Sequence, residues 1–392
     1  MSNDSAELAL LPNGFEDLLP PQADIEAQSI STLIQTFSGF GYQRIKPPLL
    51  EFEDSLLAPG PGERLAGETF RLMDPVTHRM LGLRSDITPQ IARIASSRLA
   101  RESRPLRLTY ANDVLRTKGN QLRTVRQFCQ VGCEIIGDNG AESDVEICVL
   151  AVLGLKALGF GAVTLDMTIP GFAGALIPRD ADSETVQAIR RAVLQRDRDL
   201  LASLKGAEAG ALSHVMEISA GTKNAETLFE GLDDTILPRE MQWDIARLKT
   251  VCEGIACALD ELKIMDISVT VDLLEQAGFD YHRHLGFTLF SPKVHGELGR
   301  GGCYDVRFGK SGESETAKGF TLYMDTIRKA CKSVTVKGQV FVPAEAKWSE
   351  IRDLQAQGHV VVRGTGTGDD GAIARCSHRY EGGKVVSNKG SS

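Results

Sequence analysis

The sequence lacks three features that would each place it in a special class of protein. None of its apolar runs approaches the roughly 20 residues needed to span a bilayer, and its start, MSNDSAELALLPNG, has no basic segment followed by the apolar run of a signal peptide. Its eight cysteines form no CxxC pair, which argues against a disulfide framework and a structural zinc site. Its 52 acidic residues exceed the 44 basic ones, which disfavours a broad electrostatic grip on nucleic acid. We therefore expect a cytoplasmic protein with reduced thiols and no membrane contact.

What is present is the composition of a folded globular protein. Of the 392 residues, 42% are hydrophobic and 24% are charged, and the length suggests two or three domains. The segments LRLTYANDVLR and VRQFCQVGCEIIG predict a long antiparallel hairpin, and helical spacing dominates residues 183–265. The order of elements indicates an α+β protein with a mostly antiparallel central sheet.

Three further segments give specific expectations. The run YQRIKPPLLEF predicts one strand, which Pro47 and Pro48 confine to a sheet edge or to a subunit contact. The run GFTLYMDTIRKACK at 319–332 predicts a helix. The residues after 332 predict one strand-helix-strand unit, followed by a tail rich in glycine and serine.

Six segments, in this order, resemble the catalytic domain of histidyl-tRNA synthetase: GFGYQRIKPPLLE, LRSDITPQIARI, DVLRTKGNQLRTVRQFCQVGCEIIG, AGFDYHRHLGFTLF, GRGGCYD and GFTLYMDTI. The resemblance covers roughly residues 10–332 and implies a class II aminoacyl-tRNA synthetase-like core, an antiparallel sheet flanked by helices. It places a synthetase-like domain at 1–332, with a mainly helical insertion at about 175–265, and a small C-terminal α/β remnant at 333–392. It also implies a homodimer formed through residues 23–51.

The same resemblance implies a pocket for L-histidine. Such a pocket needs a carboxylate for the α-ammonium group and polar partners for the imidazole nitrogens, because an unpaired buried charge or ring N–H is costly. Asp86 stands where the family has glutamate, and His282 stands where it has tyrosine. Gln130 and Glu134 are four apart on a predicted strand, which puts both on one face of the sheet. The residues implied to bind histidine are Asp86, Thr88, Arg116, Gln130, Glu134, Tyr281, His282, Gly301 and Gly302.

The residues that would handle ATP are replaced at the matched positions. Activation of an amino acid needs cations that hold the triphosphate and neutralise the developing charge. The arginine that clamps ATP in the third synthetase motif is replaced in GFTLYMDTI, which has Asp325 and Thr326 instead. A basic loop position is Thr124, and Ala277 stands where the family has a catalytic arginine. We therefore expect no catalytic residues, no cofactor and no metal.

A synthetase-like chain with a histidine pocket but without ATP-handling residues resembles the regulatory subunits of ATP phosphoribosyltransferase, a family of paralogues of histidyl-tRNA synthetase. The resemblance implies a non-catalytic partner of the short-form catalytic subunit in the first step of L-histidine biosynthesis. It implies activation of that subunit, feedback inhibition by histidine and a hetero-octamer. Because only a short unit remains where the synthetases have an anticodon-binding domain, tRNA is not expected as a partner.

Two other functions fit the same residues. A histidine-activating, adenylate-forming ligase with a non-tRNA acceptor would need another set of cations for ATP. A stand-alone histidine sensor would need a different partner. Asp86, Gln130 and Glu134 also fit a purely internal polar network, because buried carboxylates need partners in any case.

Each of three smaller motifs also has an explanation that involves no ligand. The glycines of RGTGTGDDG resemble a phosphate loop, but Asp369 and Asp370 would repel phosphate and no helix clearly follows. His282 and His284 have no evident third ligand for a metal. The basic loop that carries Lys118, Arg123 and Arg126 is either a solvated hairpin tip or a contact for an anion or a partner protein.

Overall fold

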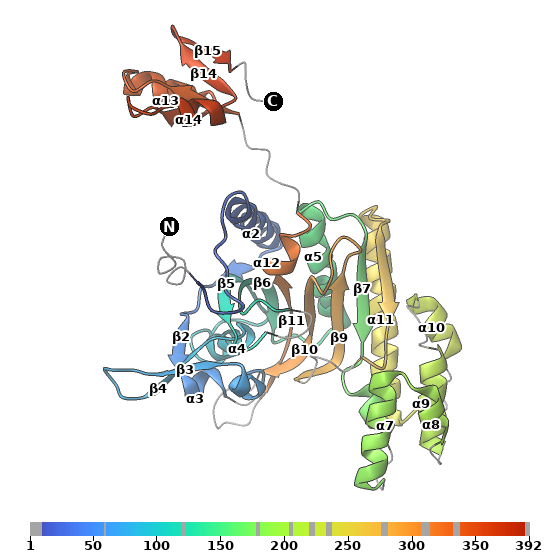
Figure 1. Cartoon of the computed structure of the whole chain (residues 1–392). Coiled ribbons are helices and arrows are strands. Elements are labelled where there is room, and N and C mark those ends of the chain that lie inside the picture. The colour runs from blue at the N-terminus through green and yellow to red at the C-terminus, as the bar shows by residue number, and fades with distance from the viewer. Residues whose placement is uncertain are drawn as a thin grey trace. The chain divides into compact units, whose positions relative to one another are not determined.

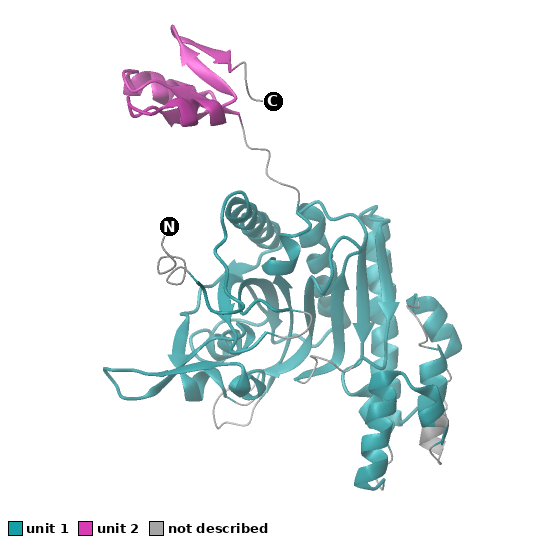
Figure 2. Ribbon diagram, viewed as in Figure 1, with its two compact units in different colours: residues 1–332 teal, residues 333–392 magenta. Residues whose placement is uncertain are grey.

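The chain divides into two compact units, residues 1–332 and residues 333–392, each with its own hydrophobic core (Figure 2). The computed structural model describes residues 10–58, 60–119, 123–177, 181–203, 207–218, 224–232, 237–275, 281–306, 314–331 and 338–388.

An eight-stranded sheet forms the centre of the large unit (Figure 1). Its strands follow the spatial order β1-β5-β6-β11-β10-β9-β7-β8. Neighbouring strands are antiparallel except for the two outermost pairs, β1 with β5 and β7 with β8. The predicted mostly antiparallel sheet is therefore confirmed. The strands are β1 (Gln43–Arg44), β5 (Leu106–Leu115), β6 (Gln127–Ile136), β7 (Val163–Thr168), β8 (Ile267–Val271), β9 (His282–Phe290), β10 (Gly299–Val306) and β11 (Glu315–Tyr323).

Two helices, α2 (Gln22–Gly39) and α5 (Ala141–Ala157), pack against this sheet. The buried residues of α2 include Ile25, Leu33 and Phe37, whose spacing puts them on one face of the helix. Gly154 lets the two helices approach, since a methyl group there would lie 3.0 Å from the side chains of Leu33 and Phe37. The face of the sheet against these helices is thus filled by the main core.

The alternation of side chains along β6 sends two sets of residues to opposite faces of the sheet. Cys129, Val131, Cys133 and Ile135 belong to the core beneath α2 and α5. The even-numbered residues, which include Gln130 and Glu134, point to the other face. This alternation is what makes a polar site possible on a fully buried strand.

A second, three-stranded sheet lies beside the first and has the order β2-β4-β3. Its strands are β2 (Leu50–Phe52), β3 (Phe70–Met73) and β4 (Met80–Leu83), accompanied by the helical segments α3 (Glu53–Leu56), η1 (Glu63–Gly67) and α4 (Thr88–Ser96). The single strand predicted around Pro47 and Pro48 is wrong, because the prolines separate β1 and β2, which belong to different sheets. The carbonyl oxygens of both prolines instead accept hydrogen bonds from Arg84, so the break is held in place.

Within the described residues, the segment predicted as a helical insertion is made mainly of helices. It consists of α6 (Phe172–Ala175), α7 (Ser183–Gln195), α8 (Arg198–Ser203), α9 (Ala207–Ile218), α10 (Ala225–Gly231) and α11 (Arg239–Glu261). Side-chain caps start two of these helices: Asp182 accepts from the Thr185 amide and Asn224 from the Thr227 amide. The longest helix, α11, packs on α5, which joins the insertion to the main core.

The helix predicted for 319–332 is wrong in its first part. Residues up to Tyr323 form strand β11, paired on both sides, and only α12 (Met324–Ile327) is helical. The run is apolar throughout because both faces of β11 are buried, and such a run has no period that distinguishes a strand from a helix.

The small unit contains more structure than predicted. Its sheet has the order β13-β12-β14-β15, with strands β12 (Gln339–Val342), β13 (Val360–Arg363), β14 (His378–Glu381) and β15 (Lys384–Ser387) and helices α13 (Trp348–Ala356) and α14 (Asp370–Arg375). The predicted strand-helix-strand unit is present, but the segment expected to trail off adds α14 and a hairpin. None of the described helices of the chain combines the length and apolar character that a membrane crossing requires.

Candidate ligand-binding site

A cavity of about 340 Å³ opens on the polar face of the central sheet. Strands β6, β9, β10 and β11 form its walls, and residues near η1 and the start of α4 complete it. The predicted residues that line it are Asp86, Thr88, Arg116, Glu134, Tyr281, His282 and Gly301. These side chains come from four separate segments of the chain.

Glu134 lies in the wall formed by β6 and is 2% exposed. The Tyr304 hydroxyl donates to its Oε2 at 3.1 Å, and the Thr88 hydroxyl donates to its Oε1 at 3.4 Å. Burial raises the pKa of the Glu134 carboxyl to about 8, although the hydrogen bond from Tyr304 acts in the opposite direction. The Glu134 carboxyl is therefore poised to hold or release a proton near neutral pH.

Asp86 is held in place by two neighbours. The Thr88 amide donates to Asp86 Oδ1, and Gln130 Nε2 donates to Asp86 Oδ2, both at 2.9 Å. The other end of the Gln130 amide accepts from the Ile87 amide at 3.1 Å. Gln130 is completely buried and does not line the cavity, so it orients Asp86 from behind.

Tyr281 and His282 form an aromatic wall. Their rings stack with centroids 4.2 Å apart, and Tyr281 meets Tyr304 edge to face at 5.8 Å. Burial, assisted by the positive charge of Arg300, lowers the pKa of His282 to about 3. His282 is therefore a neutral imidazole in the cavity wall across the physiological pH range.

The glycines of β10 and β11 keep the walls thin. A methyl group on Gly301 would lie 2.5 Å from the Gly319 carbonyl oxygen, and one on Gly302 would lie 2.6 Å from the His282 ring. Gly302 does not line the cavity, so its role is to let the His282 ring lie against the backbone. A methyl group on Gly319 would overlap the Glu134 carboxylate. Glycine is therefore required at 319 for Glu134 to occupy its position.

Two guanidinium groups of the cavity wall are engaged by carboxylates of the chain itself. Arg116 Nε lies 3.4 Å from Glu68 Oε2, and Arg300 pairs with Glu297. Both pairs line the cavity. Their positive charges are thus partly neutralised before any ligand binds.

Arg123 is buried, which contradicts the interpretation of its loop as a solvated hairpin tip. Its Nε lies 3.0 Å from Asp325 Oδ2, and its guanidinium packs 3.7 Å over the Tyr323 ring. Arg126 donates to the carbonyl oxygens of Arg116 and Asn13. Only Lys118 remains exposed as predicted, and residues 120–122 lie outside the described part of the chain.

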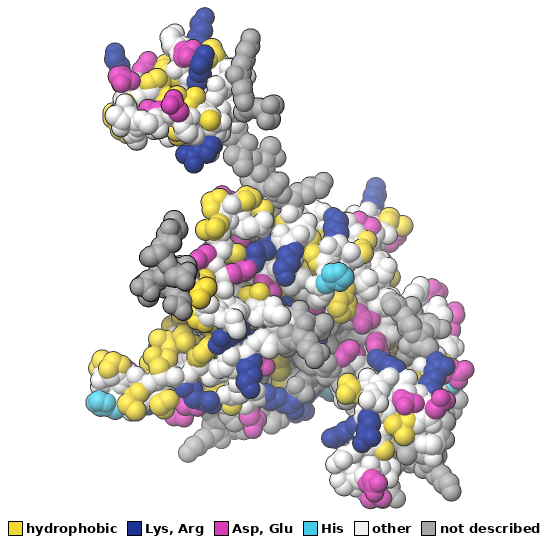
Figure 3. Space-filling model, in the orientation of Figure 1, with side chains coloured by type: hydrophobic (Ala, Val, Ile, Leu, Met, Phe, Trp, Pro, Cys, Tyr) yellow, Lys and Arg dark blue, Asp and Glu magenta, His cyan; other side chains and the backbone are white. Residues whose placement is uncertain are grey.

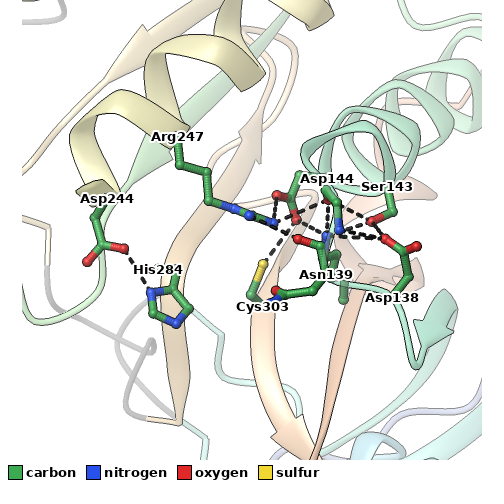
Figure 4. Close-up of polar contacts among 10 residues, drawn as sticks. Asp138, Asn139, Ser143, Asp144, Asp244, Arg247, His284 and Cys303 are labelled. Carbon is green, nitrogen blue, oxygen red and sulfur yellow. Dashed lines mark hydrogen bonds and ion pairs between the residues drawn. The ribbon is translucent and has the colours of Figure 1, made fainter. Parts of the chain in front are cut away.

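A buried polar cluster around Asp144 lies on the opposite face of the sheet (Figure 4). Lys318, which is 1% exposed and precedes Gly319, places its Nζ 3.1 Å from Asp144 Oδ1 and 2.5 Å from the Ser143 hydroxyl. Arg247 of α11 lies 2.6 Å from Asp144 Oδ2, and the Cys303 thiol donates to Oδ1 at 3.1 Å. The cluster ties α5, the inserted helix α11 and strands β10 and β11 together.

The two remaining motifs are occupied by contacts within the chain. His284 Nδ1 lies 2.8 Å from Asp244 Oδ1, with its ring against Trp243, so it does not join His282 (Figure 4). No group of three or more metal-ligating side chains occurs in the described ranges. In RGTGTGDDG, the Asp369 carboxylate accepts the Thr365 and Gly366 amides, and α14 does follow the loop, contrary to the sequence expectation.

Several lining residues were missed by the sequence analysis, namely Arg64, Glu68, Glu297, Arg300, Tyr304 and Gly319. Tyr304 and Gly319 both stand within quoted segments, GRGGCYD and GFTLYMDTI, but no spacing marked them. Arg300 stands in the same segment GRGGCYD, inside β10, and Glu297 lies just before that strand, but no recognisable motif marked either residue. Ala277 lies outside the described residues.

Comparison with known proteins gives a consistent result. A family model described as histidyl-tRNA synthetase matches residues 14–327. Among curated relatives, the ATP phosphoribosyltransferase regulatory subunit of Rhodospirillum centenum is 40% identical and covers 97% of both chains. That of Rhodospirillum rubrum is 41% identical and covers 91% of both. A solved structure described as an ATP phosphoribosyltransferase regulatory subunit/histidyl-tRNA synthetase, from Bacillus halodurans, aligns with a TM-score of 0.77 at 22% identity over 94% of this chain and 96% of that one, which supports the fold.

Proposed function

Because the chain belongs to the family of ATP phosphoribosyltransferase regulatory subunits, we propose that it activates a short-form catalytic subunit and makes that subunit sensitive to L-histidine. Its place is then in histidine biosynthesis, in the cytoplasm, without tRNA. The observation that carries the proposal is the cavity with two oriented carboxyl groups, Asp86 and Glu134, next to a neutral aromatic wall.

The proposed pose of histidine follows from the charges of the lining residues. Asp86, already oriented by Gln130 and the Thr88 amide, accepts the α-ammonium group. The Glu134 carboxyl and the Tyr304 hydroxyl, which share a hydrogen bond, offer polar partners to the imidazole nitrogens, and the Tyr281 and His282 rings cover the ligand. Arg116 faces the α-carboxylate. A cavity of 340 Å³ accommodates an amino acid of this size.

The absence of synthetase chemistry is part of the proposal. At the matched ATP clamp, Asp325 adds negative charge, and Arg123 is already paired with it at 3.0 Å. A triphosphate brought to this place would have to displace a buried ion pair, which is costly. The contact therefore supports ligand binding without adenylate formation.

Assembly is proposed on the pattern of the family. Residues 23–51 would form the homodimer contact, and the exposed apolar side chains of Phe40, Leu49 and Leu50 lie in or next to that segment. Figure 3 shows further hydrophobic side chains over the hairpin of β3 and β4. Dimers of this chain with catalytic subunits would give the hetero-octamer.

The experiment is the formation of phosphoribosyl-ATP by the short-form catalytic subunit, with and without this protein, while histidine is titrated. We expect activation by the wild-type chain and inhibition by histidine. Glu134→Gln keeps the shape of the side chain and removes its titratable carboxyl group, and it should raise the half-inhibitory histidine concentration at least about tenfold. Unchanged activity on adding the wild-type chain would overturn the proposal.

Two assays separate the alternatives. Histidine-dependent exchange of pyrophosphate into ATP would identify an adenylate-forming ligase, which the Arg123–Asp325 pair argues against. Retention of the catalytic subunit on the immobilised chain distinguishes a regulatory subunit from a histidine sensor that acts elsewhere. We expect no exchange and clear retention.

A further inference from the structure

A second cavity, of about 800 Å³, lies in the helical insertion between α10, α11 and β8. It shares no lining residue with the proposed histidine pocket. Its floor consists of Phe229, Ile264, Met265, Ile267 and Val269. We call these residues, with the acidic walls described below, the insertion groove.

The floor of the insertion groove exposes apolar surface that a soluble chain normally covers. Met265 is 82% exposed, and Ile264, Ile267 and Val269 are half-buried. Ile267 and Val269 alternate along β8 and therefore face the same side of the sheet. Burying such side chains against a partner is favourable in proportion to the apolar area removed from water.

β8 is the outermost strand of the eight-stranded sheet at this end. It pairs with β7 along one side, and on its other side the described residues provide a single bridge, between Asn224 and Thr270. The edge next to the half-buried Ile267 and Val269 is thus a place where another extended segment could add main-chain hydrogen bonds.

The walls of the insertion groove are acidic. Glu226 and Glu230 stand one turn apart on α10, and Glu253 and Asp260 stand on α11, against a single lysine, Lys249. All four carboxylates belong to exposed residues. This charge would repel nucleic acid and anionic membrane surfaces, and it would also oppose a second copy of the same groove. It favours a protein segment with apolar side chains and flanking lysines or arginines.

We propose that the insertion groove is a docking surface for the catalytic subunit, which would contribute an apolar segment with basic flanks. This inference rests on the proposed function and names the part of the chain that meets the partner. It gives the insertion a role separate from ligand binding, since histidine would bind on the synthetase-like core.

The test measures binding of the short-form catalytic subunit to the full chain by titration calorimetry at low and high salt. Met265→Asp places a charge on the floor, and Glu226→Lys combined with Glu230→Lys reverses one wall. We expect each to weaken binding at least about tenfold, and the wall variant to reduce the salt dependence as well. Leu262→Asp and Glu261→Lys are matched controls, because both residues are exposed near the same helix end and neither lines the groove.

Five outcomes decide the matter. Loss of binding in the groove variants, with controls and histidine affinity unchanged, supports the docking surface. Groove variants that bind within twofold of wild type overturn it, as do controls that lose as much affinity. A change in self-association alone would assign the groove to a second copy and overturn it too. If the wild-type chain binds no catalytic subunit, the proposed function itself fails, and this is distinguishable because no variant is then needed.

Discussion

Arg123 and Asp325 form a buried ion pair, with the guanidinium Nε 3.0 Å from the carboxylate Oδ2. The two residues are 8% and 4% exposed and come from segments that lie far apart in the sequence. The pair fixes the loop after β5 to the start of α12, next to the Tyr323 ring that the guanidinium covers. The pair is thus part of the scaffold of the large unit.

Removing one member of this pair should destabilise the fold. Arg123→Met leaves the Asp325 carboxylate buried without its cation, and we expect a loss of about 3 kcal/mol in the free energy of unfolding. The measurement is urea denaturation followed by circular dichroism. Arg79→Met is the control, since its 3.7 Å pair with Asp54 is exposed and should change stability by less than about 1 kcal/mol. Equal effects in the two variants would contradict the structural role of Arg123.

The pKa of Glu134 predicts how stability depends on pH. The folded-state pKa, about 8, lies above the ordinary value of a glutamate, so the folded state binds the proton more tightly than the unfolded state. This contribution is fully present below about pH 4, the ordinary pKa, and it is lost as pH rises through the folded pKa near 8.

Glu134→Gln removes this titration. Between pH 5 and 8 the unfolding free energy of the wild type should fall relative to that of the variant, with a slope of order 1 kcal/mol per pH unit. Urea unfolding of both proteins at four pH values gives the difference directly. A difference that stays constant with pH would show that Glu134 is ionised throughout this range.

Gln130 should affect histidine binding without touching the ligand. Gln130→Leu removes the donor to Asp86 Oδ2 and leaves the Ile87 amide without its acceptor. We expect an affinity loss of about tenfold and a stability loss of about 1–3 kcal/mol, measured by calorimetry and urea denaturation. Gln130→Glu retains the acceptor for Ile87 but sets a carboxylate against Asp86, so it should lower affinity further. Affinity equal to wild type in both variants would remove Gln130 from the site.

The cluster around Asp144 should matter more than an exposed pair of similar geometry. Lys318→Met leaves Asp144, which is completely buried, with one cation fewer, and we expect a loss of about 3–5 kcal/mol in unfolding free energy. Lys156→Met breaks the partly exposed pair with Asp266, whose atoms lie 2.7 Å apart. This variant should change the unfolding free energy by less than about 1 kcal/mol. Comparable losses in the two variants would contradict the importance of burial.

The sequence predicted elements and residues whose signals are local. The hairpin of β5 and β6 follows from residue patterning, and the placement of Asp86 and Glu134 follows from matched motifs. The contacts that the sequence did not predict depend mostly on residues that lie far apart in the chain. Arg123 is buried because it pairs with Asp325, which lies some two hundred residues further along the chain. Tyr304 reaches Glu134 only because β10 and β6 flank β11. The Gly-rich segment after β13 is held by the Asp369 carboxylate, which accepts hydrogen bonds from two backbone amides of that segment. Residue periodicity does not predict such contacts.

Glycine at position 319 and glutamate at position 134 limit which substitutions each position can accept during evolution. Any side chain at 319 would occupy the space of the Glu134 carboxylate, so a lineage in which 319 gains a side chain must first shorten residue 134. The reverse order passes through an intermediate with a steric conflict in the middle of a buried sheet. Substitutions at these two positions should therefore appear together or in one order only, and a change in the ligand of this pocket would begin at residue 134.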